Sequence, residues 1–502
     1  MEQLNGLDAS FLNIETPTVH GHVGGLAVFD TTQSPMSLET VKGLITERLH
    51  ELGPFRQRLV TVPFGIDRPY WIEDEAFDLD FHVRHIAIPS PGSREQLADL
   101  VARLHSRPLD RSRPLWELYF IEGIEGGLVA HYTKIHHACV DGVTGTEVLT
   151  TLLDTEAESR PAAGQAVPWS PDRTPTSLEM LGRGLAALAT QPRVQVRMQR
   201  RLLAAGLQTG RRQVAPTMAT MQEAMRRTPG LGFFVPEPRP GDGFLSRPSL
   251  TAPRLSFNRS ISAHRRLAFG SISLDDVKEI KDRHRVTVND VIMAICAGAL
   301  RRWLDDRHEL PTDPLLAMVP VSVRNVTDDT DGNPSTGNRI SAMIAPLPTN
   351  DPDPLNRLRL ANAAMDLAKT DHAALPADML QDFGRFAPPA VAARVARLVA
   401  RTKLADMTNP PFNVVISNIP GPQHPLYCAG ARQVASFPLP VISDGAGLNI
   451  TLASYDGSIN FGLLACRDAI DDLWSLMEAI ETATEELLNA SRTHAEQSQE
   501  KR

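Results

Sequence analysis

Residues 128–153 read LVAHYTKIHHACVDGVTGTEVLTTLL, and the pattern of apolar residues changes in the middle of this stretch. Leu128 to Ile135 is rich in β-branched and aromatic residues, which predicts a strand. Val143 to Leu153 places apolar residues at helical spacing, which predicts a helix. His136 and His137 therefore fall on a strand-to-helix turn. We expect a fold of the α/β (α+β) class.

Outward from this turn, caps and apolar spacing predict further helices and strands. Ser93 to Gln96 has the form of a capping box and predicts the start of a helix. Two more helices are expected after the N-caps Ser273 and Thr287, with Asp290 supporting the second cap. The other predictions are strands at Leu316 to Val323, Val414 to Ser417, Leu448 to Ser454 and Ser458 to Leu464, and a final helix at Ile470 to Leu488. The last two strands form an expected hairpin around Asp456-Gly457.

Composition limits the class of protein and the kind of partner. The 502 residues, 42% of them hydrophobic and 22% charged, are typical of two or three globular domains. A net charge of -8 offers no positive field for phosphate backbones, so nucleic acid is not an expected partner. The N-terminus lacks the pattern of a secretory signal, and no run reaches the ~20 apolar residues of a membrane span. Any membrane contact is expected to be peripheral.

Cysteine spacing indicates the compartment. The four cysteines lie far apart and form no Cys-x-x-Cys pair, which argues against a zinc site and against a disulfide scaffold. They are Cys139, Cys296, Cys428 and Cys466. A reducing cytoplasm is therefore the predicted location.

Prolines and charge divide the chain into four segments. We expect a first domain at 1–160, a proline-rich crossover at 161–265, a second domain at 266–490 and a polar tail at 491–502. Within the crossover, Leu178 to Gln213 is a basic amphipathic island that Pro192 should break or kink. Two interpretations stay open for this island: docking on an anionic membrane or a lipid droplet, or packing as a connector across both domains.

The turn from His136 to Gly142 holds groups suited to acid–base chemistry. A neutral imidazole, here that of His137, can accept a proton near pH 7, and Gly142 lets the backbone turn tightly. If His137 takes the proton of an alcohol, the oxygen can attack a thioester directly. Asp141 would shape the turn.

Other interpretations of the same residues are open or weaker. The two histidines could be purely structural. His137 and Asp141 could share a metal ion, but no third ligand is spaced for it, so no metal is expected. Covalent serine catalysis is disfavoured because the sequence lacks a Gly-x-Ser-x-Gly elbow. Cys139 is expected to be a small buried hydrophobe.

The sequence as a whole resembles the bacterial wax ester synthase/diacylglycerol acyltransferase family. Six ordered segments from both ends of the chain carry the resemblance. They are Leu7-Asp8-Ala9-Ser10-Phe11, Phe77 to Arg84, Pro114-Leu115-Trp116-Glu117, His136 to Gly142, Asn289-Asp290 and Ser417-Asn418-Ile419-Pro420-Gly421-Pro422.

The resemblance implies a fold and an activity. It implies two domains of the chloramphenicol acetyltransferase type with the active-site channel between them. It further implies O-acyl transfer from acyl-CoA, as co-substrate and without any cofactor, to diacylglycerol or a long-chain alcohol. His137 would be the general base, beside His136, and Asp141 would hold loop geometry, through an arginine that the sequence does not identify. Asn289 and Asp290 would support the site or cap a helix.

Two rival functions remain at this stage. One is a related transferase of the same fold, such as a condensation enzyme, because these also use the His-His-x-x-x-Asp pattern. The other is a noncatalytic lipid-binding or droplet-coating protein. The sequence does not rank diacylglycerol against long-chain alcohols as acceptors.

Overall fold

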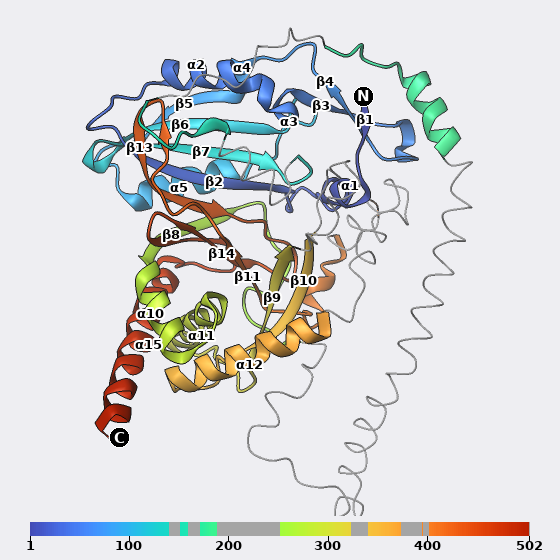
Figure 1. Cartoon of the computed structure of the whole chain (residues 1–502). Helices are drawn as coiled ribbons and strands as arrows, with labels where there is room; N and C mark the ends of the chain where they lie inside the picture. The colour runs from blue at the N-terminus through green and yellow to red at the C-terminus, as the bar shows by residue number, and fades with distance from the viewer. Residues whose placement is uncertain are drawn as a thin grey trace, which may run out of the picture.

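Two six-stranded sheets, one above the other, organise the computed structural model (Figure 1). A smaller three-stranded sheet lies beside the upper one. The structure describes residues 1–139, 151–158, 171–187, 252–322, 340–372, 394 and 401–500. All statements below concern these residues.

Strands and helices alternate through most of the chain. The strands are β1 (Glu2–Gln3), β2 (His22–Asp30), β3 (Gln57–Val60), β4 (Tyr70–Glu73), β5 (Val83–Ala87), β6 (Trp116–Ile124), β7 (Leu128–His136), β8 (Arg265–Ser273), β9 (Leu315–Ser322), β10 (Ile340–Leu347), β11 (Val414–Ile419), β12 (Tyr427–Cys428), β13 (Ala431–Leu439), β14 (Leu448–Tyr455) and β15 (Ser458–Cys466). The α-helices are α1 (Gly6–Asn13), α2 (Leu38–Arg48), α3 (Gly53–Arg56), α4 (Leu79–His82), α5 (Arg94–His105), α10 (Leu274–His284), α11 (Val288–Asp306), α12 (Pro354–His372) and α15 (Trp474–Glu500). Short 3-10 turns are η1 (Leu49–Glu51), η2 (Pro63–Gly65), η3 (Glu125–Gly127) and η6 (Leu404–Asp406).

The upper sheet has the order β12-β13-β2-β7-β6-β5 and carries helices on both faces. Strand β7 is antiparallel to β2 on one side and to β6 on the other. Because neighbouring residues of a strand point to opposite faces, Val129 packs in the core with α2 and α3, whereas Ala130 packs in the core with α5. Strand β7 therefore has a neighbouring strand on each edge and packs against helices on each face.

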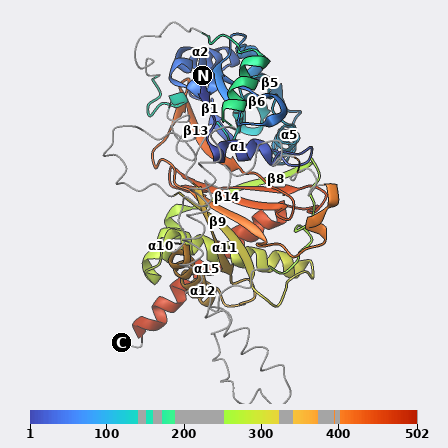
Figure 2. The ribbon, with the colours of Figure 1, turned by 90° about the vertical axis from the view of Figure 1, so that its right-hand side faces the viewer.

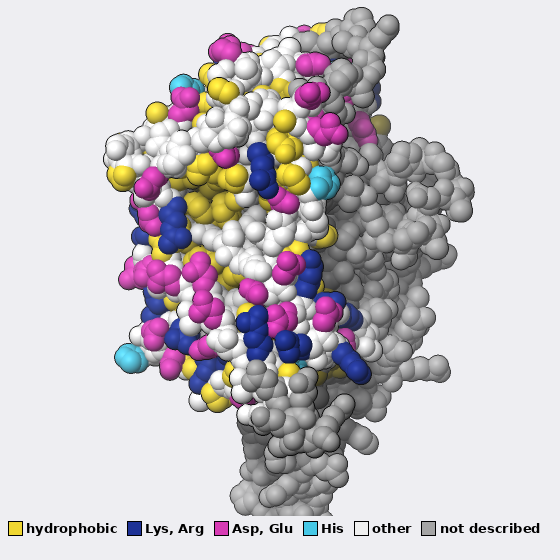
Figure 3. All heavy atoms as spheres, turned by 60° about the vertical axis from the view of Figure 1, so that its left-hand side comes forward, with side chains coloured by type: hydrophobic (Ala, Val, Ile, Leu, Met, Phe, Trp, Pro, Cys, Tyr) yellow, Lys and Arg dark blue, Asp and Glu magenta, His cyan; other side chains and the backbone are white. Residues whose placement is uncertain are grey.

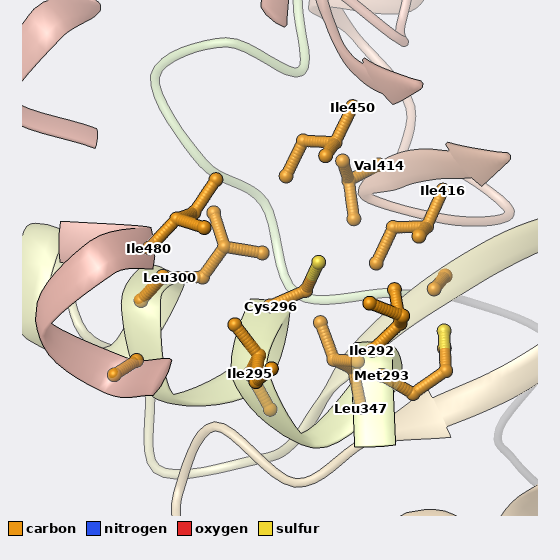
Figure 4. Close-up of a cluster of buried hydrophobic side chains, with 14 of the residues drawn as sticks. Ile292, Met293, Ile295, Cys296, Leu300, Leu347, Val414, Ile416, Ile450 and Ile480 are labelled. Atoms are coloured by element: carbon orange, nitrogen blue, oxygen red, sulfur yellow. The ribbon is translucent and has the colours of Figure 1, made fainter. Parts of the chain in front are cut away.

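The lower sheet has the order β10-β9-β11-β14-β15-β8 and is covered on one face by α10, α11, α12 and α15. Helix α11 is the centre of this core, with buried residues around most of its circumference. Figure 4 shows Ile292 and Cys296 of α11 close to Val414 and Ile416 of β11. A helix that is apolar all round needs cover on every side, and the sheet and the neighbouring helices supply it.

The second half of the chain contributes a strand to the upper sheet. Strand β13 follows β11 in the sequence, yet it pairs with β2 of the upper sheet. It also lies across β15 of the lower sheet, where a Cβ built on Gly462 would meet the carbonyl oxygen of Pro438 at 1.7 Å. The two sheets thus touch through backbone, and only glycine fits at position 462.

Most expected elements are confirmed. The capping boxes of Ser93 with Gln96 and of Thr287 with Asp290 are present, and Ser273 caps α10. The hairpin turns through Asp456 and Gly457, both with positive φ. The four strands appear at or within two residues of the expected bounds. Most of the predicted helix at Val143 to Leu153 and most of the island at Leu178 to Gln213 lie outside the described residues.

The final helix differs from the expected Ile470 to Leu488. It begins at Trp474, because the Asp472 carboxylate accepts hydrogen bonds from the backbone N–H of Trp474 and Ser475. It continues through Glu500 as α15, beyond the point where a polar tail was expected. Arg492 in this extension forms an ion pair with Glu279 of α10 at 2.8 Å, so a polar segment stays helical by contact with a neighbouring helix.

The described helices and one face of the surface show how apolar residues are distributed. Among the described helices, none combines the length and the apolar character needed to cross a bilayer. On the face in Figure 3, hydrophobic side chains gather in the upper half, and acidic and basic side chains are mixed over the lower half.

The contact at Gly462 generates a prediction about stability. Gly462→Ala should lower the free energy of unfolding by about 1–3 kcal/mol, because the added methyl group must push β13 away from β15. Gly43→Ala is the matched control: Gly43 lies in α2 with open space around its Cα, and alanine there should raise stability by about 0.5–1 kcal/mol. Chemical denaturation of both variants measures the difference. Equal stability of the two variants would contradict the packing of β13 on β15.

Candidate active site

His136 and His137 sit where β7 ends, and both neighbouring strands hold their backbone. The N–H of His136 donates to the carbonyl oxygen of Leu115 at 2.9 Å, and that of His137 donates to the carbonyl oxygen of Gly21 at 2.8 Å. Leu115 precedes β6 and Gly21 precedes β2. The turn is therefore hydrogen-bonded to the segments that lead into the strands on either side of β7. These contacts set the position of His137.

The buried ring of His136 braces the turn from inside. Its Nδ1 accepts a hydrogen bond from the N–H of Ala138 at 3.0 Å, and its carbonyl oxygen accepts one from the N–H of Cys139 at 2.9 Å. Its Nε2 faces Oε1 of Glu15 at 3.3 Å. Because Nδ1 is the acceptor, the proton of a neutral His136 is on Nε2, which lies within ion-pair distance of the carboxylate without hydrogen-bond geometry.

Glu15 is a carboxylate fixed by three groups. Oε1 accepts a hydrogen bond from the N–H of Gly21 at 2.7 Å, and Oε2 accepts one from Nε of Arg111 at 3.0 Å. Burial raises the pKa of Glu15, but the contact with His136, the charge of Arg111 and the N–H of Gly21 outweigh it and lower the pKa to about 2. Glu15 is therefore ionised at neutral pH.

His137 itself is half-buried, and its ring stacks on an aromatic side chain from α1. The centroids of the His137 and Phe11 rings lie 4.1 Å apart, with 10° between their planes. Helix α1 is held in place by its N-cap Asn5, whose side chain accepts a hydrogen bond from the N–H of Asp8 at 2.8 Å. The imidazole thus keeps one orientation, which a general base requires.

Gly21 is required by close packing. A Cβ at this position would lie 2.7 Å from Nε2 of His136 and 2.9 Å from the carbonyl oxygen of Phe11. A residue with any side chain would therefore displace the bracing histidine or the helix end that carries Phe11.

Cys139 is in the turn but is poorly suited to be a nucleophile. Burial raises the pKa of its thiol well above the ordinary value, and Asp8 raises it further. The thiol stays protonated at neutral pH. Cys139 is only partly buried, and it packs against the edge of two apolar clusters rather than inside one, so the expectation of a buried residue holds in part.

Two expected site residues, Asp141 and Gly142, lie outside the described residues. Their assigned roles, holding and turning the loop, remain predictions. No group of three or more His, Cys, Asp or Glu side chains in the described part of the chain could hold a metal ion.

Asn289 and Asp290 open α11 in the second half of the chain. Oδ2 of Asp290 accepts hydrogen bonds from the N–H of Thr287 at 2.9 Å and from Nδ2 of Asn362 at 3.0 Å. These contacts fit the capping alternative and also join α11 to α12. Direct participation of Asn289 or Asp290 in catalysis stays a prediction.

Two other segments of the resemblance meet beside β7 and act as scaffold. Glu117 forms an ion pair with the buried Lys134 of β7 at 2.9 Å, and Nζ of Lys134 donates to the carbonyl oxygen of Leu104 at the end of α5. His82 stacks on Trp116, with 4.6 Å between ring centroids, and its Nδ1 lies 2.8 Å from the Trp116 carbonyl oxygen. These residues fix shape rather than perform chemistry.

Sequence reasoning missed three residues of the site: Glu15, Gly21 and Arg111. They precede the turn in the chain, and Glu15 is separated from His136 by several elements, so no local pattern connects them. The family segment Leu7 to Phe11 was found, but the stacking of Phe11 on His137 was not.

Known families match both halves of the chain. Residues 4–292 match the model of the wax ester synthase/diacylglycerol acyltransferase catalytic domain, and residues 336–488 match the model of the WS/DGAT C-terminal domain.

Individual relatives match over nearly the whole length. O-acyltransferase WSD of Acinetobacter baylyi is 33% identical over 485 residues, which cover 96% of each chain. A Mycobacterium tuberculosis protein named probable diacylglycerol O-acyltransferase tgs2 is 36% identical over 493 residues, covering 96% of this chain and 98% of the relative.

Solved structures share the fold. The wax ester synthase/diacylglycerol acyltransferase from Marinobacter aquaeolei VT8 matches with a TM-score of 0.63 and 28% identity over 97% of this chain and 99% of that one. The starter condensation domain of rhizomide synthetase matches with a TM-score of 0.51 and 11% identity over 98% and 94%. The expected two-domain α/β acyltransferase fold is confirmed.

The glycine beside the histidines generates one prediction. Gly21→Ala should lower stability by about 1–3 kcal/mol and reduce catalytic turnover, because the methyl group displaces the His136 ring. Gly25→Ala, in the strand β2 that follows Gly21, is the matched control, since no atom lies within 4 Å of its added Cβ. Thermal unfolding and an acyl-transfer assay compare the two. An equal effect at both positions would refute the close contact.

The carboxylate generates a pH-dependent prediction. The pKa of Glu15 is about 2 in the folded protein and 4.5 as the ordinary value, so ionisation stabilises the fold above pH 4.5 and this contribution is lost as the pH falls toward 2. Glu15→Gln should therefore cost up to roughly 3 kcal/mol near pH 7 and much less near pH 3. Urea denaturation at several pH values, with Glu125→Gln as an exposed control, measures this. A pH-independent difference would contradict the ionised contact.

Proposed function

Because this chain belongs to the wax ester synthase/diacylglycerol acyltransferase family, we propose that it transfers a long-chain fatty acyl group from acyl-CoA to diacylglycerol. The product is triacylglycerol, and the same chemistry on a long-chain alcohol gives a wax ester. Acyl transfer as the reaction class follows from the family. The acceptor and the roles of individual residues are our proposal.

In the proposed reaction, His137 is the general base. Its imidazole takes the proton of the acceptor hydroxyl while the oxygen attacks the thioester carbon. The tetrahedral oxyanion then collapses, the bond from carbon to sulfur breaks, and the coenzyme A thiolate takes the proton from the imidazolium. The ester forms without an acyl-enzyme and without a metal or cofactor, so acyl-CoA is needed only as a co-substrate.

One observation carries this assignment: the two neighbouring histidines have opposite environments. His136 is buried, with both ring nitrogens directed to groups of the turn and to Glu15. His137 is half-buried and has one ring face on Phe11. Of the two, His137 is the ring that a substrate could approach.

His136 and Glu15 are then positioning residues. The Ala138 N–H and the Glu15 carboxylate orient the His136 ring, and the ring holds the backbone that carries His137. We further propose that Asp141 keeps the loop geometry, that Gly142 permits its tight turn, and that Asn289 and Asp290 support the site from the second half.

The acceptor determines where the reaction takes place. Diacylglycerol is insoluble in water, so the proposed reaction requires contact with a lipid phase. We propose a cytoplasmic protein that acts peripherally, at the inner membrane or at a lipid droplet.

The general base generates the central prediction. His137→Gln should reduce turnover by roughly 10²–10⁴-fold with little change in stability, because the ring that accepts the proton is lost. The assay follows thiol release from palmitoyl-CoA with diacylglycerol present and identifies the lipid product by chromatography. His264→Gln, at an exposed position in the second half, is the matched control.

The outcomes separate the proposal from its rivals. Thiol release without triacylglycerol or wax ester would indicate another transferase of this fold, and no thiol release by the wild type would indicate a noncatalytic lipid-binding protein. Unchanged turnover in His137→Gln would refute the general-base role.

A further inference from the structure

Several arginines of the first half lie close to one another beside the end of β7. Glu117 of β6 forms ion pairs with Nη2 of Arg84 at 3.4 Å and with Nζ of Lys134 at 2.9 Å. The same Nζ donates a hydrogen bond to the carbonyl oxygen of Arg107 at 3.1 Å. With Arg113, described next, these arginines are called the Arg84–Arg107–Arg113 group.

Arg113 joins the group through an aromatic ring. Its guanidinium carbon lies 4.1 Å from the centre of the Phe81 ring, and the guanidinium carbon of Arg84 lies 4.7 Å from the same centre. Nη1 of Arg84 also donates a hydrogen bond to the hydroxyl of Tyr119 at 3.3 Å. The two guanidinium groups are therefore neighbours on one aromatic side chain.

Positive charge is in excess at this place. Glu117 lies between Arg84 and Lys134, and the carboxylate of Asp110 interacts with the group by its charge. Burial lowers the pKa of Lys134, and the charges of Arg84 and Arg107 lower it further against the opposing ion pair. The cations therefore repel one another, and a bound anion would relieve that repulsion.

Two of the guanidinium groups have unused hydrogen-bond donors. Within the described residues, the side chains of Arg107 and Arg113 donate no hydrogen bond and form no ion pair. Arg107 is exposed and Arg113 is half-buried. The planar donors of arginine match phosphate oxygens two at a time. The group thus offers both the charge and the donors that a phosphate requires.

The group lies at the end of the sheet that carries the general base. Lys134 is in the last turn of the ladder before His137, which follows directly after β7. Arg111, in the same segment as two members of the group, forms an ion pair with Glu15 of the site. Figures 1 and 2 show α5, whose end precedes Arg107, between the upper sheet and β8 of the lower one. The group is therefore close to the site and to the junction of the two halves.

The acyl donor of the proposed reaction has matching chemistry. Coenzyme A carries a diphosphate and a 3′-phosphate at one end and the thioester at the other. Because the thioester must reach His137, the phosphates must bind at some distance from it. The protein has a net charge of -8, which repels a polyanion, so binding requires a local excess of positive charge.

We propose that the Arg84–Arg107–Arg113 group binds the phosphates of the acyl-CoA donor. The inference rests on the proposed function, in which acyl-CoA is the co-substrate. Arg107 and Arg113 donate to the phosphate oxygens, while Arg84 adds charge and is held by Glu117 and Phe81. The phosphate of a lipid headgroup has the same chemistry, and the experiment below separates the two sources.

The test uses the full chain with Arg107→Gln and Arg113→Gln combined, which removes the charges and the planar donors. The control combines Arg359→Gln and Arg467→Gln, at exposed positions of the second half, and changes the net charge by the same amount. A third variant, Arg107→Lys with Arg113→Lys, keeps the charge only. Arg107→Gln alone, at an exposed position, tests the site if the double variant unfolds more easily.

Binding is measured by isothermal titration calorimetry with coenzyme A and by cosedimentation with phosphatidylglycerol vesicles. We expect the Kd for coenzyme A to rise at least roughly tenfold in the glutamine variant, less in the lysine variant, and to stay unchanged in the control. Added salt should weaken binding by the wild type more than binding by the glutamine variant.

Turnover separates recognition of the phosphates from recognition of the acyl chain. In the glutamine variant, the KM for palmitoyl-CoA should rise at least roughly tenfold relative to the KM for the palmitoyl thioester of N-acetylcysteamine, which has no phosphate. The ratio of the two KM values should stay at its wild-type value in the control.

Equal Kd values for coenzyme A in the glutamine variant and the control would overturn the proposal. So would a loss of vesicle binding with coenzyme A binding retained, because the ligand would then be a lipid headgroup. If the wild type binds coenzyme A through this group but transfers no acyl chain, the proposed function fails and the phosphate site stands. If the wild type transfers the acyl chain and the glutamine variant binds coenzyme A normally, only the phosphate site fails.

Discussion

The site depends on one partly buried carboxylate, Glu15, and on the three groups that it holds together. The N–H of Gly21 belongs to the approach to β2, Nε2 of His136 to the end of β7, and Nε of Arg111 to the chain that leads into β6. These three segments lie at the ends of the neighbouring strands β2, β7 and β6. A single ionised side chain therefore fixes the relative positions of the strand ends around His137, and burial in this arrangement makes the loss of any partner costly.

A second charged side chain, Lys134, ties β7 to its neighbours. Lys134 is buried two residues before His136, and burial lowers its pKa, while Glu117 opposes that shift. The ammonium group also meets the carbonyl oxygen of Leu104 at the end of α5, where a cation is favourable. Strand β7 is thus tied to β6 and to α5 by charge as well as by its ladder. Trp116 and Glu117 thus act on His137 only through β7.

The sequence predicted elements well wherever the signal was local. The caps at Ser93, Ser273 and Thr287 and the turn at Asp456-Gly457 depend on residues within four positions of one another, and all were confirmed. Contacts between distant segments were not predictable in this way. The pairing of β13 with β2 joins residues some four hundred positions apart, and nothing in either strand alone specifies the other. For the site, spacing identified His136 and His137, but the partners that give them different roles come from other parts of the chain.

The small three-stranded sheet connects the site to another part of the first half. Strand β1 pairs with β4, the strand that follows the Phe64 turn, and β1 leads within a few residues into α1, which carries Phe11. The N–H of Leu4, between β1 and α1, donates to the carbonyl oxygen of Pro69 at 3.0 Å, so this connection is fixed at both ends. The Phe64 turn joins β3 and β4 of the small sheet, and α1, which carries Phe11, follows the edge strand β1 of the same sheet. The Phe11 ring that stacks on His137 is therefore positioned by the contact of the Leu4 backbone with Pro69 as well as by the Asn5 cap of α1.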